Sequence, residues 1–479
     1  MALLHGYSIN STADDQDSDT APFLKKEVEK ITVPPKCCSV RCNLAAMMFF
    51  GFAVVYGLRV NLSVAMVAMV NETNDQSSSN SNISNEYPWS PKMQGMLLSA
   101  FFFGYLFTQI PGGYLSGRFG GSLFLGGGVL GTAVLTLLTP LSAQLGAKWL
   151  FALRALEGFG EGVTFPAMMA MWARWAPPLE RARLMTFSGA GSSFGAFVAL
   201  PLTGFICHSL GWPAVFYSCG GVGCLWAVFW FILVSDEPRT HPRISDREKY
   251  YIINSIGAQG TPHGWSVPVL SMLFSVPLWA IIIPQMCSNW SYYTLLTSLP
   301  TYMDTVLHFD LRQNSFLSAL PYLADWLFSV GSGVLADNLL ERELLSVTAV
   351  RKLFTFIGLF LPAVFLLAVG FTGCSAVLAV TFLTLSSAFG GFSAGGVFIN
   401  QIDIAPRYVG TLHGITNTFG TIPGVIAPIV VGYLTKDHSV TGWRHVFWLS
   451  AGVSAFGAIF YVIFGTGKIQ IHLPSVIQP

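Results

Sequence analysis

Charge is what this sequence has least of. Only 10% of its 479 residues are Asp, Glu, Lys or Arg, whereas ordinary soluble domains carry about 25%. The 25 Lys and Arg are balanced by 24 Asp and Glu, which gives a formal net charge of +1. This composition lacks the basic excess that binding to the phosphate backbone uses, so we expect no nucleic-acid partner.

Catalytic and processing motifs are also missing. The nine histidines contain no H-E-x-x-H or similar spacing, so we expect neither an intramembrane metalloenzyme nor a metal or other cofactor. Four of them, His208, His308, His438 and His445, are expected near helix ends, and the others in loops. The first 36 residues are polar and lack the apolar stretch of a cleavable signal peptide.

Long apolar runs are what the sequence does contain. Hydrophobic residues make up 52% of the chain, and runs of the length that spans a bilayer recur along most of it. The fold class expected is therefore an all-α polytopic membrane protein. We predict twelve transmembrane helices, at approximately 44–70, 93–116, 121–142, 148–172, 184–208, 212–235, 273–303, 313–336, 352–372, 376–400, 409–434 and 443–466.

Basic residues predict the orientation of these helices. With a cytosolic N-terminus, 18 of the 25 Lys and Arg lie in cytosolic segments, five lie on the opposite side, and Arg59 and Arg154 lie well inside the membrane. This bias predicts that both termini are cytosolic. The loop 71–92 then faces the lumen or the exterior, where its sequons at Asn71 and Asn82 are expected to be glycosylated.

The expected helices fall into two groups of six. We predict a tail at 1–42, a bundle at 43–235, a cytosolic linker at 236–271, a second bundle at 272–467 and a tail at 468–479. The bundles share short motifs in the same order, such as Gly211-Trp212 before the sixth span and Gly442-Trp443 before the twelfth. A parallel repeat of six-helix units predicts the major facilitator fold, with the substrate site between the halves. A carrier with alternating access is favoured over a channel.

Three ionisable residues interrupt the fourth span. Arg154, Glu157 and Glu161 fall within roughly 60° of one another on a helix. Because each charge at the centre of a bilayer costs about 2.5–3.5 kcal/mol, this face should point into the protein or a water-filled cavity. Arg59 lies at a similar depth on the first span, so we expect Arg59, Glu157 and Glu161 around one central cavity.

The motifs resemble a family within the major facilitator superfamily. They resemble the anion/cation symporter family, which includes the type I phosphate transporters and the vesicular glutamate transporters, and the paired glutamates are most similar to its sialin branch. The similarity runs from about residue 37 to 467 and is carried by 56–65, 104–121, 154–168, 175–181, 290–297, 299–303, 400–406 and 414–424. Three positions depart from the pattern: Gly117 replaces the Asp of many members, and Met169 and Asp325 replace a His and a Gly-Ser of that branch.

The resemblance implies roles for particular residues. It makes Arg59 the anchor for an anion, and Glu157 and Glu161 the proton-coupling residues, with Arg154 beside them. It also implies proton-coupled symport of sialic acid, other acidic sugars and acidic amino acids, in a lysosomal, endosomal or vesicular membrane. The alternative is a sodium-coupled phosphate or urate-type organic anion transporter of the plasma membrane. We expect a monomer surrounded by lipid, with protons as the coupling ion and sodium as the alternative.

Other residues are weaker candidates. Aromatic side chains that are expected to line the cavity, unless they only pack, are Tyr56, Phe102, Phe103, Tyr105, Tyr292, Tyr293 and Tyr302. Asn400 and Asn417 are expected to reach the ligand, and Asp325 is an intramembrane acid with no partner evident in the sequence. Arg118 and Asp337 are expected to form cytosolic gates.

The functional hypothesis is an exchange of partners. At acidic lumenal pH a proton on Glu157 or Glu161 frees an arginine from an internal ion pair, and the arginine then binds the carboxylate of the substrate. The alternative is a permanent pair between Arg154 and Glu157, three residues apart, which only ties helices together.

Overall fold

The described part of the chain is helical. The computed structural model describes residues 39–70, 87–177, 180–256, 269–309, 311–373, 375–405, 408–436 and 439–468, and these contain no strand. The first half consists of α2 (Val40–Val70), α3 (Pro91–Phe119), α4 (Gly121–Leu137), α5 (Thr139–Leu145), α6 (Ala147–Glu161), α7 (Thr164–Trp175), α8 (Arg181–Gly189), α9 (Gly191–Leu210) and α10 (Trp212–Leu233). α11 (Asp246–Ile256) lies in the predicted linker.

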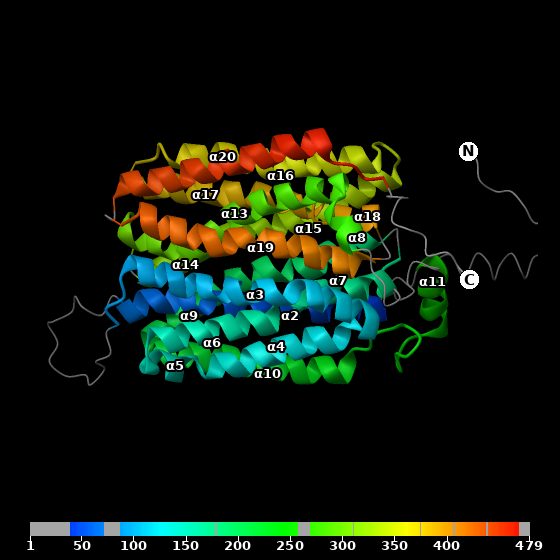
Figure 1. Ribbon diagram of the computed structural model, residues 1–479, viewed down its shortest axis with the longest axis horizontal. Coiled ribbons are helices and arrows are strands. Elements are labelled where there is room, and N and C mark those ends of the chain that lie inside the picture. The colour runs from blue at the N-terminus through cyan, green and yellow to red at the C-terminus, as the bar shows by residue number, and fades with distance from the viewer. Residues whose placement is uncertain are drawn as a thin grey trace, which may run out of the picture.

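The second half follows the same plan. It consists of α12 (Val269–Leu273), α13 (Val276–Thr305), α14 (Leu311–Leu317), α15 (Leu320–Glu341), α16 (Val347–Val369), α17 (Ala376–Gly390), the 3-10 turn η2 (Gly391–Ala394), α18 (Asn400–Ile404), α19 (Val409–Leu434) and α20 (Val440–Phe464). Figure 1 shows the halves as two layers of roughly parallel helices, with α19 beside α3 between them.

The helices bear out a multi-pass membrane protein. Among the described residues, nine helices are long and apolar enough to cross a membrane, or ten if α4 and α5, which are bent by 47°, form one span. The expected span 148–172 falls on α6 and α7, which are separate helices, and 273–303 falls on α13, which buries the polar Gln285 and Asn289. The count of twelve stays a prediction.

Local sequence explains where the helices begin and break. Ser90 and Ser439 accept hydrogen bonds from the backbone N–H groups of Met93 (3.3 Å) and Gly442 (3.1 Å), and so cap α3 and α20. Gly120 joins α3 to α4 with a φ of 107°, a conformation that favours glycine. The carboxylate of Asp236 occupies the space where a side chain at Gly120 would begin.

Glycines bring the two halves close together. A Cβ added at Gly113 in α3 would overlap the backbone carbonyl of Gly410 in α19, and one added at Gly95 would meet the carbonyl of Pro428. The two positions on α3 are 18 residues apart, roughly 27 Å along the helix. The contact between α3 and α19 therefore runs along most of their length.

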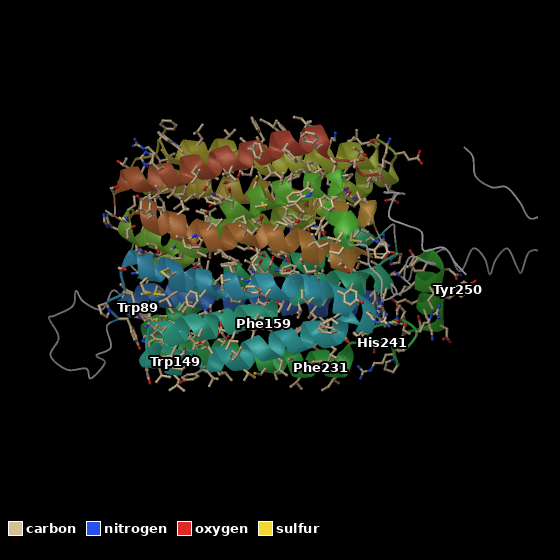
Figure 2. The ribbon with its side chains drawn as sticks, viewed as in Figure 1. Trp89, Trp149, Phe159, Phe231, His241 and Tyr250 are labelled. Carbon is tan, nitrogen blue, oxygen red and sulfur yellow. The ribbon has the colours of Figure 1, made fainter. Side chains whose placement is uncertain are left out.

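Apolar side chains cover the outside of the bundle. Phe159 and Phe231 are about half exposed, and Figure 2 shows them on the lower half of the bundle, whereas the polar His241 lies toward the end that carries α11. We call this end the linker end. An apolar surface of this kind suits contact with lipid, and lipid stays the expected surroundings.

Candidate functional site

A cavity of about 220 Å³ lies between the halves. Helices from both halves contribute to its wall, which is mainly apolar and also carries aromatic and polar side chains. Residues that line the cavity include Tyr56, Tyr105, Met169, Ser193, Tyr292, Tyr293, Asp325, His413 and Asn417. The cavity therefore lies where the repeat predicted the substrate site.

The ion pair between Arg59 and Glu161 lies behind the cavity wall. Arg59, Glu157 and Glu161 are not among the residues that line the cavity, which corrects the expectation that these three charges surround it. Arg59 Nε donates to Glu161 Oε1 at 3.1 Å, and Nη2 contacts the same oxygen. The other carboxylate oxygen, Oε2, is buried and has no hydrogen-bond partner among the described residues. Glu161 thus ends α6 with one oxygen satisfied and one free to accept.

Aromatic rings surround the guanidinium of Arg59. Its Cζ atom lies 4.5 Å from the ring centroid of Tyr56, 4.8 Å from that of Tyr105 and 4.9 Å from that of Phe101. Such contacts stabilise a buried cation. Because Tyr56 and Tyr105 also line the cavity, Arg59 lies directly behind these two rings.

The pair between Arg154 and Glu157 is built differently. Arg154 Nη1 donates to Glu157 Oε2 at 2.7 Å, and Thr139 donates to the other oxygen, Oε1, at 3.1 Å. Arg154 Nη2 donates to the backbone carbonyl of Arg59 at 3.1 Å. Neither Arg154 nor Glu157 is among the lining residues, so this pair connects α6 to α2 and α5.

The predicted aromatic and amide candidates divide into two groups. Tyr56, Tyr105, Tyr292, Tyr293 and Asn417 line the cavity. Phe102 was also expected to line the cavity, but it lies behind these residues, with its ring centroid 4.6 Å from that of Tyr293 and 5.8 Å from the guanidinium of Arg59.

Three candidates do not reach the cavity. Tyr302 lies nine residues beyond Tyr293 on α13, roughly 13 Å along the helix, and packs on Trp443 and Phe447. Asn400 instead donates to the hydroxyl of Tyr461 at 2.8 Å and so holds α18 against α20. Phe103 is 48% exposed on the outside of the bundle. The structure corrects the expectation that these three line the cavity.

Asp325 has a partner that the sequence did not reveal. The hydroxyl of Ser193, on α9 in the first half, donates to Asp325 Oδ2, on α15 in the second half. Both residues line the cavity. Asp325 is therefore part of a contact between the halves at the cavity wall.

The predicted gate residues lie at the linker end. Asp337 accepts a hydrogen bond from the backbone N–H of Arg183 at 3.0 Å and so joins the two halves. Arg118 lies at the end of α3, with its guanidinium 5.8 Å from the ring of Phe119. Sequence reasoning missed Arg174, which donates to the carbonyl of Gly117 at 2.8 Å. The predicted glycosylation sites Asn71 and Asn82 lie outside the described residues.

A chain of buried amides was also missed. Gln109, Gln285, Gln401 and His413 have exposed fractions of 3% or less and are connected by hydrogen bonds next to the cavity. His413 was expected in a loop, but it lies on α19. The available signal was its position inside the predicted span 409–434, where a polar side chain is costly.

Comparison with known proteins decides the family. Residues 48–428 match the model of the Major Facilitator Superfamily. The chain belongs to this superfamily. It is 48% identical to human sialin and 49% identical to sheep sialin, in each case over 95% of both chains. It is 40% identical to the human "Probable small intestine urate exporter", over 90% of this chain and 91% of that one.

The fold agrees with solved structures of the superfamily. An inward-facing, occupied bacterial homologue of the human lysosomal transporter Spinster aligns with a TM-score of 0.60 at 14% identity, over 89% of this chain and 97% of that one. The identity to the two sialins over nearly the whole chain confirms the resemblance to the sialin branch of the anion/cation symporters. The protein is a transporter of this superfamily for small anions and is not an enzyme.

Proposed function

We propose that the protein is a proton-coupled symporter that moves sialic acid and other acidic sugars out of an acidic lumen, in a lysosomal, endosomal or vesicular membrane. High identity to sialins over nearly the whole chain supports this substrate class. The observation that carries the coupling is the ion pair of Arg59 and Glu161, because it lies behind the cavity wall and leaves one carboxylate oxygen without a partner in the described part of the chain.

Protonation of Glu161 is the first step of the proposed cycle. Its unpartnered Oε2 can take a proton while Oε1 still faces Arg59. Once the carboxyl group is neutral, its attraction for the guanidinium falls and the positive charge of Arg59 becomes available. Two nitrogens of Arg59 that now contact Glu161 can then bind both oxygens of a substrate carboxylate.

The pair also explains how the empty carrier returns. A lone buried guanidinium is costly, whereas a paired one is compensated. Arg59 is compensated by ionised Glu161 when the site is empty, and by the substrate when Glu161 is protonated. In both states the buried site has the same net charge. The protein can therefore change conformation either with one proton and one monovalent anion or with neither.

The access route passes Tyr56 and Tyr105. Their rings stand between Arg59 and the cavity, so they must turn aside when the substrate carboxylate reaches the guanidinium. The cavity of about 220 Å³ lies below the range of roughly 300–1,000 Å³ that is typical of pockets for drug-sized ligands. It suits one small organic acid, with some widening on binding.

The coupling ion separates this proposal from its alternative. A mouse "Sodium-dependent phosphate transport protein 3" is 39% identical over 90% of this chain and 95% of that one, so a sodium-coupled phosphate or urate-type carrier is the second candidate. Purified protein in liposomes should take up labelled sialic acid under an imposed proton gradient and not under a sodium gradient alone. The reverse result selects the alternative.

Substitution of Glu161 tests the coupling step. In wild type, we expect uptake to rise as the pH falls on the substrate side, because protonated Glu161 releases Arg59. The Glu161→Gln variant should lose this pH dependence, since the amide cannot ionise. Initial uptake rates across a pH series in liposomes measure it. Glu341→Gln, at an exposed position near the end of α15, is the matched control, and an unchanged pH dependence in Glu161→Gln removes Glu161 from the mechanism.

A further inference from the structure

The cavity wall contains a polar group that is separate from the pair of Arg59 and Glu161. This group is His413 on α19, whose side chain lines the cavity but is only 3% exposed. One ring nitrogen, Nδ1, lies 2.7 Å from Oε1 of Gln401. The other, Nε2, is buried and has no hydrogen-bond partner among the described residues. Such a nitrogen at a cavity wall is costly unless a ligand or water binds it.

The hydrogen bonds of the neighbouring amides fix the proton on His413. Gln401 donates through Nε2 to Gln285 Oε1 at 3.2 Å, so its oxygen is the atom that faces the imidazole. A carbonyl oxygen can only accept, and Nδ1 must therefore donate. In the neutral ring the remaining nitrogen, Nε2, is then an acceptor.

The chain continues in one direction into the other half of the protein. Gln285 donates to Asn417 Oδ1 at 3.5 Å, Asn417 donates to Gln109 Oε1 at 2.9 Å, and Gln109 donates to the hydroxyl of Thr421 at 3.4 Å. Each amide has its oxygen turned toward the previous donor. Turning any one amide around would place two donors or two acceptors against each other, so the amides are oriented as a set. In the orientation that the structure has, Nε2 of His413 is an acceptor.

We propose that His413 forms a subsite that accepts a hydrogen bond from a hydroxyl group of the transported molecule. The subsite deepens the proposed function and rests on it, because it assumes that this cavity is the transport site. Within the acidic sugars of the proposed function, it assigns a place to each group: the carboxylate binds at Arg59 and a ring hydroxyl binds at His413. Simple carboxylates fill the first position and leave Nε2 without a donor.

Competition between two acids of equal charge tests this subsite. Glucuronate and cyclohexanecarboxylate both have a six-membered ring and one carboxylate, but only glucuronate has hydroxyls. Each is titrated against bound labelled sialic acid on the purified transporter in detergent, without any gradient. We expect glucuronate to compete roughly tenfold better in wild type, as for one hydrogen bond to an otherwise unsatisfied buried group. In His413→Leu this preference should fall toward one, through weaker competition by glucuronate.

Two further variants keep the test decisive. His413→Gln can again offer an acceptor oxygen and should restore part of the preference. Gln401→Leu leaves the imidazole in place but removes the acceptor that holds the proton on Nδ1, so it should weaken the preference even if His413→Leu does not fold. His445→Leu, outside the cavity lining, is the control. A wild-type preference near one, or an unchanged preference in both His413→Leu and Gln401→Leu, overturns the subsite.

The role of Glu161 in proton coupling is measured independently of the subsite at His413. Binding is measured without a gradient, whereas the role of Glu161 is measured from the pH dependence of uptake. Loss of the preference in His413→Leu with proton-driven uptake retained supports the subsite. Loss of pH dependence in Glu161→Gln with the preference for glucuronate retained supports the coupling residue alone. Failure of one proposal therefore does not conceal the other.

Discussion

The two buried ion pairs on α6 look alike in the sequence and differ in the structure. In both, the arginine side chain is 2% exposed and the glutamate is fully buried. Glu157 has both carboxylate oxygens occupied, by Arg154 and Thr139. Glu161 has one oxygen occupied by Arg59, and its other oxygen has no partner among the residues that the structure describes. Burial alone therefore does not distinguish the two glutamates, and our proposal for Glu161 depends on its incomplete set of hydrogen bonds.

The chain connectivity of the pairs differs as well. Arg154 and Glu157 are three residues apart on one helix, so their distance is set by the helix itself. Arg59 and Glu161 lie on different helices, α2 and α6, and their distance can change when these helices move. The first pair suits a fixed connection, and the second suits a switch.

Replacing each pair completely should give the largest contrast. Arg59→Met with Glu161→Leu removes both charges and should leave a folded protein, because apolar replacements of a buried pair are often neutral for stability. Uptake should fall on the order of a hundredfold, since a bidentate carboxylate contact is lost. Arg154→Met with Glu157→Leu should keep most of the uptake. Size-exclusion profiles and initial rates in liposomes measure both.

Equal losses of uptake in the two folded double variants would contradict this contrast. Equal large losses would mean that both pairs take part in transport, and equal small losses would mean that neither does. The control is Arg351, whose Nε donates to Asp403 at 2.7 Å near the linker end. Arg351→Met with Asp403→Leu changes a third pair of similar chemistry outside the cavity lining.

A single substitution should show how much the pair between Arg154 and Glu157 contributes to the stability of the protein. Arg154→Met leaves the Glu157 carboxylate buried without its cation, which costs about 3–5 kcal/mol in comparable cases. We expect a clearly lower melting temperature in detergent, and recovery when Glu157→Leu is added. If Arg154→Met melts like wild type, the pair does not hold α6 in place, and the distinction between fixed pair and switch is lost.

The family, the burial of the charged residues and part of the cavity wall could be predicted from the sequence. Long apolar runs predicted a multi-pass protein, and the spacing of Arg154, Glu157 and Glu161 predicted one buried face, because helical periodicity and the cost of charge in lipid leave few alternatives. Both features depend on residues that are near in the chain. They can be derived without knowing how the two halves meet.

The features that could not be predicted from the sequence depend on contacts between segments that are distant in the chain. Which glutamate meets Arg59 depends on how α2 packs on α6, about 100 residues later in the chain. The amide chain from His413 to Gln109 passes through four helices. The prediction that Tyr302 and Asn400 line the cavity was wrong. Residue type alone does not show how far along α13 or α18 a residue lies from the cavity, or toward which neighbour its side chain points.

A third acid, the half-buried Asp325 at the cavity wall, extends the comparison and should give the smallest effect. Asp325 accepts from the neutral hydroxyl of Ser193, so this contact between the halves needs an acceptor but no charge. Asp325→Asn keeps an acceptor oxygen and should change uptake by less than about twofold. Asp325→Leu removes it and should lower uptake roughly fivefold, as for one hydrogen bond of about 1 kcal/mol. Initial rates in liposomes measure both. If Asp325→Asn abolishes uptake as Arg59→Met with Glu161→Leu does, charge at this wall matters, and an incomplete ion pair is no longer what distinguishes the working acid.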